Sequence, residues 1–335
     1  MPIKADQSRP KPLSIQIPMN EPFFSLRVSR KHQLTPDIVL IDLVHPEGFD
    51  LPVFTPGAHI TVQTPKGLHR SYSLCGQPKD QQKWQIAVKR ENAGRGGSSS
   101  MFDDLLEGDQ LQTHPWLNLF ELKDQAKFFI FVAGGIGITP IMSMMRHLMS
   151  MGKNNFQLYY CTRDPLSTAF LEQLNAPEIV DHVKIHHDHG DLSQALDLWP
   201  LFENPNGSDI YCCGPAGLMD SVRDMTGHWP SDSVHFESFG VCENTSNENN
   251  SFDIILNSSG RRIHVSPDCS ILDALRSNGE SVSSSCESGT CGSCRTGLIS
   301  GEAEHRDYVL LDDEKDTHIM VCVSRALTPE LVLDL

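Results

Sequence analysis

Three cysteines within nine residues constrain the fold of this chain more than any other feature of its sequence. They lie in residues 284–294, SSCESGTCGSC, whose other residues are serine, glutamate, glycine and threonine. Such a segment forms neither a regular helix nor a strand, but it can wrap around a compact metal centre. Cys286, Cys291 and Cys294 have the spacing C-x4-C-x2-C, and Cys322 follows after 27 further residues. The fold must therefore bring a distant fourth thiolate to this loop.

The spacing of the four cysteines is typical of a plant-type [2Fe–2S] cluster. Gly289 and Gly292 permit a close approach of the backbone, whose N–H groups can then bond to the cluster sulfurs. A structural zinc site is one alternative, but zinc favours paired CxxC knuckles and only one pair has that gap here. Buried free thiols are the other alternative. The remaining six cysteines are Cys75, Cys161, Cys212, Cys213, Cys242 and Cys269. We expect them to be small core residues, except that Cys213 has a second interpretation, given below.

Charge and composition restrict the setting in which the chain works. The formal net charge of -16 argues against nucleic-acid binding and keeps the chain soluble. The polar, proline-rich N-terminus has no apolar signal core, so we expect a reducing cytoplasm rather than a disulfide framework. Residues 128–145 carry no charge over 18 positions, but three glycines and a Thr-Pro favour a strand, a turn and a helix start over a membrane span. We expect a cytoplasmic monomer.

A chain of 335 residues is long enough for two or three domains. We divide the sequence into three domains, an N-terminal tail and a linker. Residues 1–21 are expected to form a loose tail. Residues 22–122 are expected to form an antiparallel β-barrel, and residues 123–240 a doubly wound α/β domain. Residues 241–250, with four asparagines and two glutamates, are a predicted linker. Residues 251–335 form a third unit with a hairpin-like start, a helix, the cysteine loop and a final strand.

Two patterns distinguish the barrel from the domain that follows it. In the barrel segment, short runs with alternating apolar residues, such as Trp84, Ile86 and Val88, are separated by glycine and proline turns. After residue 123, apolar strand runs alternate with helix-like stretches, which is typical of a parallel, doubly wound sheet.

A glycine-rich turn, GGIGITP, follows an apolar strand at residues 134–140 and opens a helix. Its glycines would let a dinucleotide approach the backbone, and Thr139 could cap the helix whose N-terminus faces the pyrophosphate. The segment CGP at residues 213–215 again ends a strand before a helix, and it supports the prediction of a dinucleotide site. Cys213 could lie against a nicotinamide, or it could be a packed strand-end thiol. The predicted nucleotide-binding residues here are Gly134, Gly135, Gly137, Cys213, Gly214 and Pro215.

Two barrel segments point to a phosphorylated ring ligand. In RSYSL, Arg70 could bind a phosphate, Tyr72 could stack on a flat ring, and Ser73 could bond to a ring nitrogen. The segment GRGGSSS precedes a helix-like run and could form a phosphate cradle. A flexible surface loop is its alternative interpretation. The predicted cradle residues are Gly94, Arg95, Gly96, Gly97 and Ser98.

In this order, RSYSL, GRGGS, GGIGITP, CGP and the cysteine quartet resemble the ferredoxin–NADP reductase superfamily with a fused C-terminal ferredoxin. The chain is more narrowly similar to the phthalate dioxygenase reductases, from about Phe23 to Leu335. The segments that carry this resemblance include LYYCTRDP, VKIHHDHGD, VHFESFG, GEAEHRD and MVCVSRA.

The resemblance implies FMN in the barrel, NADH on the α/β domain and a [2Fe–2S] cluster in a C-terminal α+β domain of the ferredoxin-like (β-grasp) type. Electrons would pass from NADH through FMN and the cluster to a Rieske-type terminal oxygenase, with phthalate dioxygenase the expected partner. Tyr72, Ser73 and Cys213 would lie at the reacting rings. The implied FMN contacts are Arg70, Ser71, Tyr72, Ser73, Ala87, Val88, Lys89, Arg95, Gly96, Gly97, Ser98, Thr139 and Phe239. Thr162 and Asp164 complete the implied NAD site.

Four alternatives remain from the sequence. Asp164 could repel a 2′-phosphate while Arg163 could attract one, and only the resemblance favours NADH over NADPH. The pattern P-x-N-x-F at the end of the barrel is one residue longer here, from Pro115 through Asn118 to Phe120, which puts this loop's geometry in question. The partner could instead be a Rieske O- or N-demethylase for vanillate or carnitine, and a zinc-stapled nucleotide-binding interaction protein is the non-enzymatic alternative.

Overall fold

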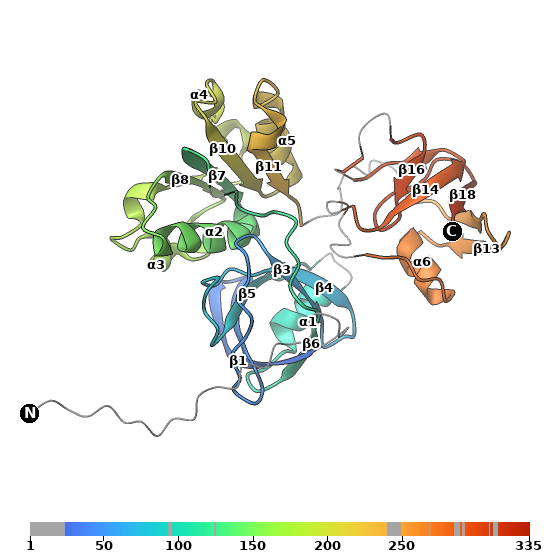
Figure 1. Ribbon diagram of the computed structural model, residues 1–335, viewed down its shortest axis with the longest axis horizontal. Helices are drawn as coiled ribbons and strands as arrows, with labels where there is room; N and C mark the ends of the chain where they lie inside the picture. Colours follow the sequence, from blue (N-terminus) through green and yellow to red (C-terminus); the bar gives the residue numbers. More distant parts are fainter. Residues whose placement is uncertain are drawn as a thin grey trace, which may run out of the picture. The chain divides into compact units, whose positions relative to one another are not determined.

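The computed structural model describes residues 24–92, 96–123, 125–239, 249–267, 269–284, 289, 292–307, 309–310 and 314–335. These residues contain one six-stranded sheet, two five-stranded sheets and one two-stranded sheet (Figure 1). By contacts between Cα atoms, Thr139–Asn154 and Leu166–Gln173 belong to one compact unit with the described residues before 124. The remaining described residues form a second unit.

The N-terminal sheet is antiparallel and closes into the expected barrel. Its strands follow the order β4-β3-β6-β1-β2-β5, and a bridge between Leu74 and Ile86 joins the two outer strands. Trp84, Ile86 and Val88 alternate along β5 and are buried, as their period of two predicts. The sequence pattern does not predict β6, because QLQT contains a single apolar residue. The elements are Phe24–Thr35 (β1), Ile38–Val44 (β2), His59–Gln63 (β3), His69–Ser73 (β4), Trp84–Lys89 (β5), Gly97–Asp103 (α1) and Gln110–Thr113 (β6).

The second sheet is parallel and has the order β11-β10-β7-β8-β9. Chain order reverses between β7 and β10, which makes the carboxyl ends of these two strands the topological switch point of the sheet, where α/β folds bind ligands. The strands are Phe128–Gly134 (β7), Phe156–Thr162 (β8), Val183–His187 (β9), Ser208–Cys213 (β10) and Val234–Glu237 (β11). The helices of this part of the chain are Ile138–Ser150 (α2), Leu171–Leu174 (α3), Trp199–Phe202 (α4) and Ala216–Met225 (α5).

Short 3-10 turns accompany these elements at Gly135–Gly137 (η1), Pro165–Ser167 (η2), Val180–His182 (η3), Leu192–Gln194 (η4) and Ser231–Ser233 (η5). Residues 128–145 thus form β7, η1 and the start of α2, as expected for a strand, a turn and a helix start. Among the described residues, no helix has the length and apolar character needed to cross a bilayer.

The third large sheet is mixed and has the order β13-β12-β18-β14-β16. Its first two strands form the expected antiparallel hairpin, while β12 and β18 pair in parallel. Ser270 caps α6 with a capping box, because its Oγ accepts from Asp273 N at 3.0 Å. The elements are Phe252–Leu256 (β12), Arg262–Val265 (β13), Ile271–Ser277 (α6), Arg295–Ser300 (β14), His318–Met320 (β16) and Glu330–Asp334 (β18), and Ala303–Glu304 (β15) pairs with Arg325–Ala326 (β17).

Candidate functional site

The RSYS segment lies on β4, where alternation places Arg70 and Tyr72 on one face and Ser71 and Ser73 on the other. Ser71 Oγ and Thr61 Oγ1 are hydrogen-bonded at 2.8 Å across the β3–β4 pair. The Tyr72 hydroxyl is buried and has no hydrogen-bond partner among the described residues. Burial raises the pKa of Tyr72, while the Arg70 guanidinium acts in the opposite direction. A neutral phenol with an unused donor fits the edge of a bound polar ring.

Two cationic side chains lie beside the glycines at the start of α1. Gly96 has a left-handed φ of 86°, and a Cβ there would lie 3.3 Å from Lys66 Nζ. A Cβ at Gly97 would lie 2.8 Å from Arg70 Nε. The first turn of α1 contains no acidic residue, so nothing in that turn repels an anion. Arg95, another predicted cradle residue, lies outside the described residues.

The third predicted barrel segment, at the end of β5, presents backbone rather than side chains. Ala87 and Val88 are buried. Lys89 Nζ forms an ion pair with Glu91 Oε1 at 3.2 Å, and Glu91 N donates to Ser98 Oγ at 3.1 Å. β5 pairs with β2 along one edge, and no strand pairing is recorded for Ala87 to Lys89 along the other edge among the described residues. Backbone groups on this edge are therefore suitable partners for a ring ligand.

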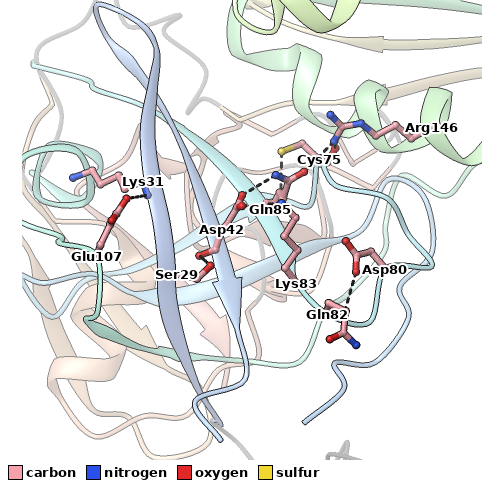
Figure 2. Close-up of polar contacts among 10 residues, drawn as sticks. All are labelled: Ser29, Lys31, Asp42, Cys75, Asp80, Gln82, Lys83, Gln85, Glu107 and Arg146. Atoms are coloured by element: carbon pink, nitrogen blue, oxygen red, sulfur yellow. Dashed lines mark hydrogen bonds and ion pairs between the residues drawn. The ribbon is translucent and has the colours of Figure 1, made fainter. Parts of the chain in front are cut away.

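A polar network ties α2 to the strands that carry the predicted flavin residues (Figure 2). Arg146 of α2 donates to the Cys75 carbonyl oxygen and, at 3.3 Å, to Gln85 Oε1. Gln85 Nε2 donates in turn to Asp42 Oδ1 at 2.7 Å, and Lys83 Nζ lies 2.8 Å from Asp42 Oδ2. Cys75 comes two residues after β4, and Gln85 lies near the start of β5. The network thus fixes α2 against both strands, which explains why this helix groups with the barrel.

The lengthened loop at the end of the barrel keeps its anchors. Asn118 Nδ2 donates to Thr55 Oγ1 at 2.7 Å, and Phe120 N donates to Asn118 Oδ1 at 3.0 Å. Leu117 forms an antiparallel bridge with His59 at the start of β3. The additional residue is therefore accommodated while Asn118 still binds the neighbouring loop.

The glycine-rich turn and the CGP segment meet at the switch point. A Cβ at Gly137 would lie 2.2 Å from the Cys213 carbonyl oxygen, and a Cβ at Gly214 would lie 2.9 Å from Gly134 N. These glycines are required because the ends of β7 and β10 pack backbone to backbone. Gly135 differs, because its φ is +53° and no atom would lie within 4 Å of a Cβ there. It is the glycine of this turn that is open to a ligand.

The remaining residues predicted to line the two sites lie at element ends. Thr139 is buried and belongs to the first turn of α2, because the helix begins at Ile138 after a 3-10 turn. The expected N-cap role of Thr139 is therefore wrong. Pro215 is the N-cap of α5, and Phe239, which follows β11, is 41% exposed.

The thiols before residue 240 are held neutral. Cys213 is fully buried, and burial, followed by the Glu237 carboxylate, raises the pKa of its thiol. Burial also raises the pKa of Cys212, that of Cys75 to about 12 and that of Cys161 to about 11. The full burial of Cys213 agrees with a packed strand-end thiol, and its contact with nicotinamide stays a prediction.

Next to the CTRDP segment lies a turn that sequence reasoning missed. Thr162 ends β8 and is buried, and Asp164 is half-buried two residues later. Asp188 N donates to Thr162 O at 3.2 Å, and His189 N donates to Arg163 O at 2.9 Å. The segment HHDHG therefore runs beside the predicted ribose-binding residues. Its position at the carboxyl end of a parallel strand is the signal that could have identified it.

Two of the four predicted cluster ligands can be placed. Cys294 precedes β14 and Cys322 follows β16, and both are buried. The two strands pair antiparallel, and Val321 N donates to Cys294 O at 3.5 Å, so the two cysteines lie at the same end of the β14–β16 pair. Cys286 and Cys291 lie outside the described residues.

Two glycines of the cysteine segment lie close to residues that come later in the chain. Gly289 and Gly292 have left-handed φ values of +74° and +76°. A Cβ at Gly289 would lie 2.7 Å from Val323 Cγ2, and a Cβ at Gly292 would lie 3.4 Å from Val309 Cγ1. Because Val323 follows Cys322 directly, Gly289 lies beside the segment that carries the predicted fourth ligand. The binding of a cluster by all four cysteines stays a prediction.

Comparison with known proteins agrees with this geometry. The 2Fe-2S iron-sulfur cluster binding domain matches residues 254–327, and the oxidoreductase NAD-binding domain matches residues 131–224. Phthalate dioxygenase reductase of Burkholderia cepacia is 52% identical over 95% of this chain and 99% of that protein. The phthalate 4,5-dioxygenase oxygenase reductase subunit of Pseudomonas putida is 52% identical over 95% of this chain and 98% of its own length. The chain belongs to the phthalate dioxygenase reductase family.

A solved structure of a phthalate dioxygenase reductase has a TM-score of 0.83 and 52% identity, covering 93% of this chain and 98% of that chain. A vanillate O-demethylase oxidoreductase of Pseudomonas sp. and a carnitine monooxygenase reductase subunit of Escherichia coli are more distant, each at 36% identity. Membership of the phthalate dioxygenase reductase family confirms the expected multidomain fold, the NADH-dependent oxidoreductase class and the set of FMN, [2Fe–2S] and NADH. It leaves the zinc-stapled alternative without support.

Proposed function

We propose that this chain is the reductase of a Rieske-type terminal oxygenase that acts on phthalate, and that it works as a cytoplasmic monomer. The observation that carries this proposal is the 52% identity, across 95% of the chain, with two reductases of phthalate-oxidising enzymes. The demethylase alternative has weaker support, because the corresponding relatives are 36% identical. When bound, FMN accepts an electron pair from NADH, and the [2Fe–2S] cluster passes on single electrons.

In this proposal, the barrel residues bind and orient FMN. Arg70 and the N–H groups around Gly97 hold the phosphate, because Arg70 Nε lies 2.8 Å from the position that a Cβ at Gly97 would occupy. Tyr72 lies along the ring system and uses its unpaired hydroxyl there. The remaining proposed contacts are Ser71, Ser73, Ala87, Val88, Lys89, Arg95, Gly96, Ser98, Thr139 and Phe239.

At the nucleotide site, Gly135 admits the pyrophosphate, since it is the open position of its turn. Asp164, and Asp188 whose backbone N donates to Thr162 O at 3.2 Å, bring two acidic residues to the segment of the predicted ribose position. Carboxylates accept hydrogen bonds from a 2′-hydroxyl and repel a 2′-phosphate, so this pair favours NADH over NADPH. Gly134, Gly137, Thr162, Cys213, Gly214 and Pro215 shape the rest of the proposed site.

The domain boundaries at residues 22–122, 123–240 and 251–335, with a tail before and a linker at 241–250, are part of the proposal. Two contacts bear on the last boundary. Arg306 Nη1 donates to Asn249 Oδ1 at 2.9 Å, and Arg325 Nη2 donates to Asn250 O at 2.9 Å. Residues 251–335 therefore bind Asn249 and Asn250, the final two residues of the predicted linker.

One experiment tests the proposed path of electrons from NADH through FMN and the cluster, and it separates flavin reduction from the later transfer through the cluster. The purified chain should release FMN on denaturation and contain about two irons. A Cys322→Ser variant should still let NADH bleach the flavin, while cytochrome c reduction falls at least about tenfold, because a cluster ligand is lost. Stopped-flow absorbance and a steady-state cytochrome c assay measure the two steps.

Cys269→Ser is the matched control, since Cys269 lies in the same unit but is not a predicted ligand. It should leave both rates unchanged. Release of FAD, or unchanged cytochrome c reduction in Cys322→Ser, would contradict the proposal. Mixing the chain with phthalate and vanillate oxygenases separates the two partner hypotheses, because we expect rapid NADH-dependent turnover with the phthalate enzyme alone.

A further inference from the structure

We propose that Lys66 is a further cation for the flavin phosphate, opposite Arg70, and selects a phosphate monoester over an uncharged flavin. The inference rests on the proposed FMN site and adds to it a residue that lies outside the RSYSL and GRGGS segments. It is carried by the convergence of Lys66 and Arg70 on two consecutive glycines before and at the start of α1.

Lys66 lies at the tip of the hairpin between β3 and β4. The turn is closed by Thr64 N donating to Leu68 O at 2.8 Å and by Gly67 N donating to Thr64 O at 2.7 Å. Gly67 has a φ of +76°, which favours glycine at this position. Arg70 follows on β4, so one rigid hairpin carries both cations.

The two cations approach adjacent backbone positions. Lys66 Nζ would be 3.3 Å from a Cβ at Gly96, and its Cδ would be 3.7 Å away. Arg70 Nε would be 2.8 Å from a Cβ at Gly97. A ligand atom seated over these glycines would therefore meet an ammonium group on one side and a guanidinium group on the other.

Nothing described at the cradle competes for the ammonium group of Lys66. Its side chain is exposed and makes no hydrogen bond or ion pair with a described residue. The carboxylate of Glu91, which lies beside Ser98, is paired with Lys89 at 3.2 Å. The first turn of α1 contains no acidic side chain.

The charge of the ligand decides how much Lys66 contributes. A phosphate monoester carries nearly two negative charges at neutral pH, so it can satisfy two cations at once. Riboflavin has no phosphate and offers Lys66 no charge. Because an exposed ion pair contributes little per unit charge, we expect an effect smaller than that of Arg70.

The test uses apoprotein prepared from the full chain and measures flavin dissociation constants by fluorescence quenching. Lys66→Ala should weaken FMN binding about 3- to 10-fold and leave riboflavin binding within about a factor of 1.5. Lys66→Arg should restore FMN affinity. Lys79→Ala, which removes another exposed loop lysine of the same unit, is the matched control and should have no effect. Raising the salt concentration to about 0.5 M should reduce the Lys66→Ala effect, since screening weakens exposed pairs.

Unchanged FMN affinity in Lys66→Ala overturns the inference while leaving the FMN site in place. An equal loss for FMN and riboflavin also overturns it, because the lysine would then act through the hairpin's structure. If the unmodified chain binds FMN no more tightly than riboflavin, the proposed phosphate site fails together with the role of Lys66.

Discussion

The turns that lead into α1 and α2 are both rich in glycine, yet their glycines have different neighbours. At the first turn, the space of a missing Cβ is bordered by the side chains of Arg70 and Lys66. At the second, Gly137 faces the backbone at the end of β10, Gly134 faces the side chains of Pro215 and Leu218 at α5, and only Gly135 is open. Glycine therefore leaves room for cationic side chains in one turn and for the close packing of neighbouring elements in the other.

This difference shows that a glycine-rich turn is not by itself a measure of ligand contact. A close backbone neighbour means that the residue is needed for folding, whether or not a ligand binds. A neighbouring cationic side chain means that space and charge are kept for an anion. Substituting one glycine at a time separates these two roles.

The largest effect is expected for Gly137→Ala. Its Cβ would lie 2.2 Å from the Cys213 carbonyl oxygen, so the ends of β7 and β10 must move apart. We expect the free energy of unfolding to fall by about 3 kcal/mol, as measured by urea denaturation. Gly217→Ala is the control, because it lies in α5 with no atom within 4 Å of its Cβ position and should not destabilise the chain. Equal stability of the two variants would contradict the packing role.

Gly97→Ala should act on the ligand instead. Its Cβ would lie 2.8 Å from Arg70 Nε and displace a flexible side chain, so folding should change little. Because Arg70 would lose a charge-assisted contact, we expect FMN affinity to fall about tenfold. Titration of apoprotein with FMN and riboflavin measures this, and a comparable loss with riboflavin would argue against a phosphate cradle.

Gly135→Ala should have the smallest effect of the three. No neighbour is displaced, but a φ of +53° costs an alanine about 1 kcal/mol. Gly152→Ala is a matched control, since its φ is +70° and its Cβ position is also open. Both variants should lose similar stability, whereas NADH affinity should fall about fivefold in Gly135→Ala alone. Equal NADH affinity in both would remove Gly135 from the dinucleotide site.

Local patterns in the sequence predict much of the fold. The alternation of Trp84, Ile86 and Val88 predicts β5, and the cysteine spacing predicts that a loop meets the strand segment of Cys322. Regular alternation and fixed spacing are visible in sequence because each reflects one element or one centre. β6 is not predicted, because its pairing with β1 and not its composition makes it a strand.

The candidate site is harder to predict from the sequence, because the residues that contact one another there come from separate segments of the chain. Nothing near Lys66 in the sequence indicates that its hairpin reaches the start of α1. The bond from Arg146 to Gln85 likewise depends on the placement of α2 against the barrel. Even the roles of Gly134 and Gly137 become clear only when the end of β10 is in view.

The raised pKa values of the thiols before residue 240 determine how readily these cysteines react with oxidants. A thiolate, not a thiol, reacts with peroxides and alkylating reagents. The four cysteines before residue 240 have raised pKa values, so at neutral pH almost none of their thiol is ionised. An electron-transferring protein is thereby protected from thiol oxidation at these four positions.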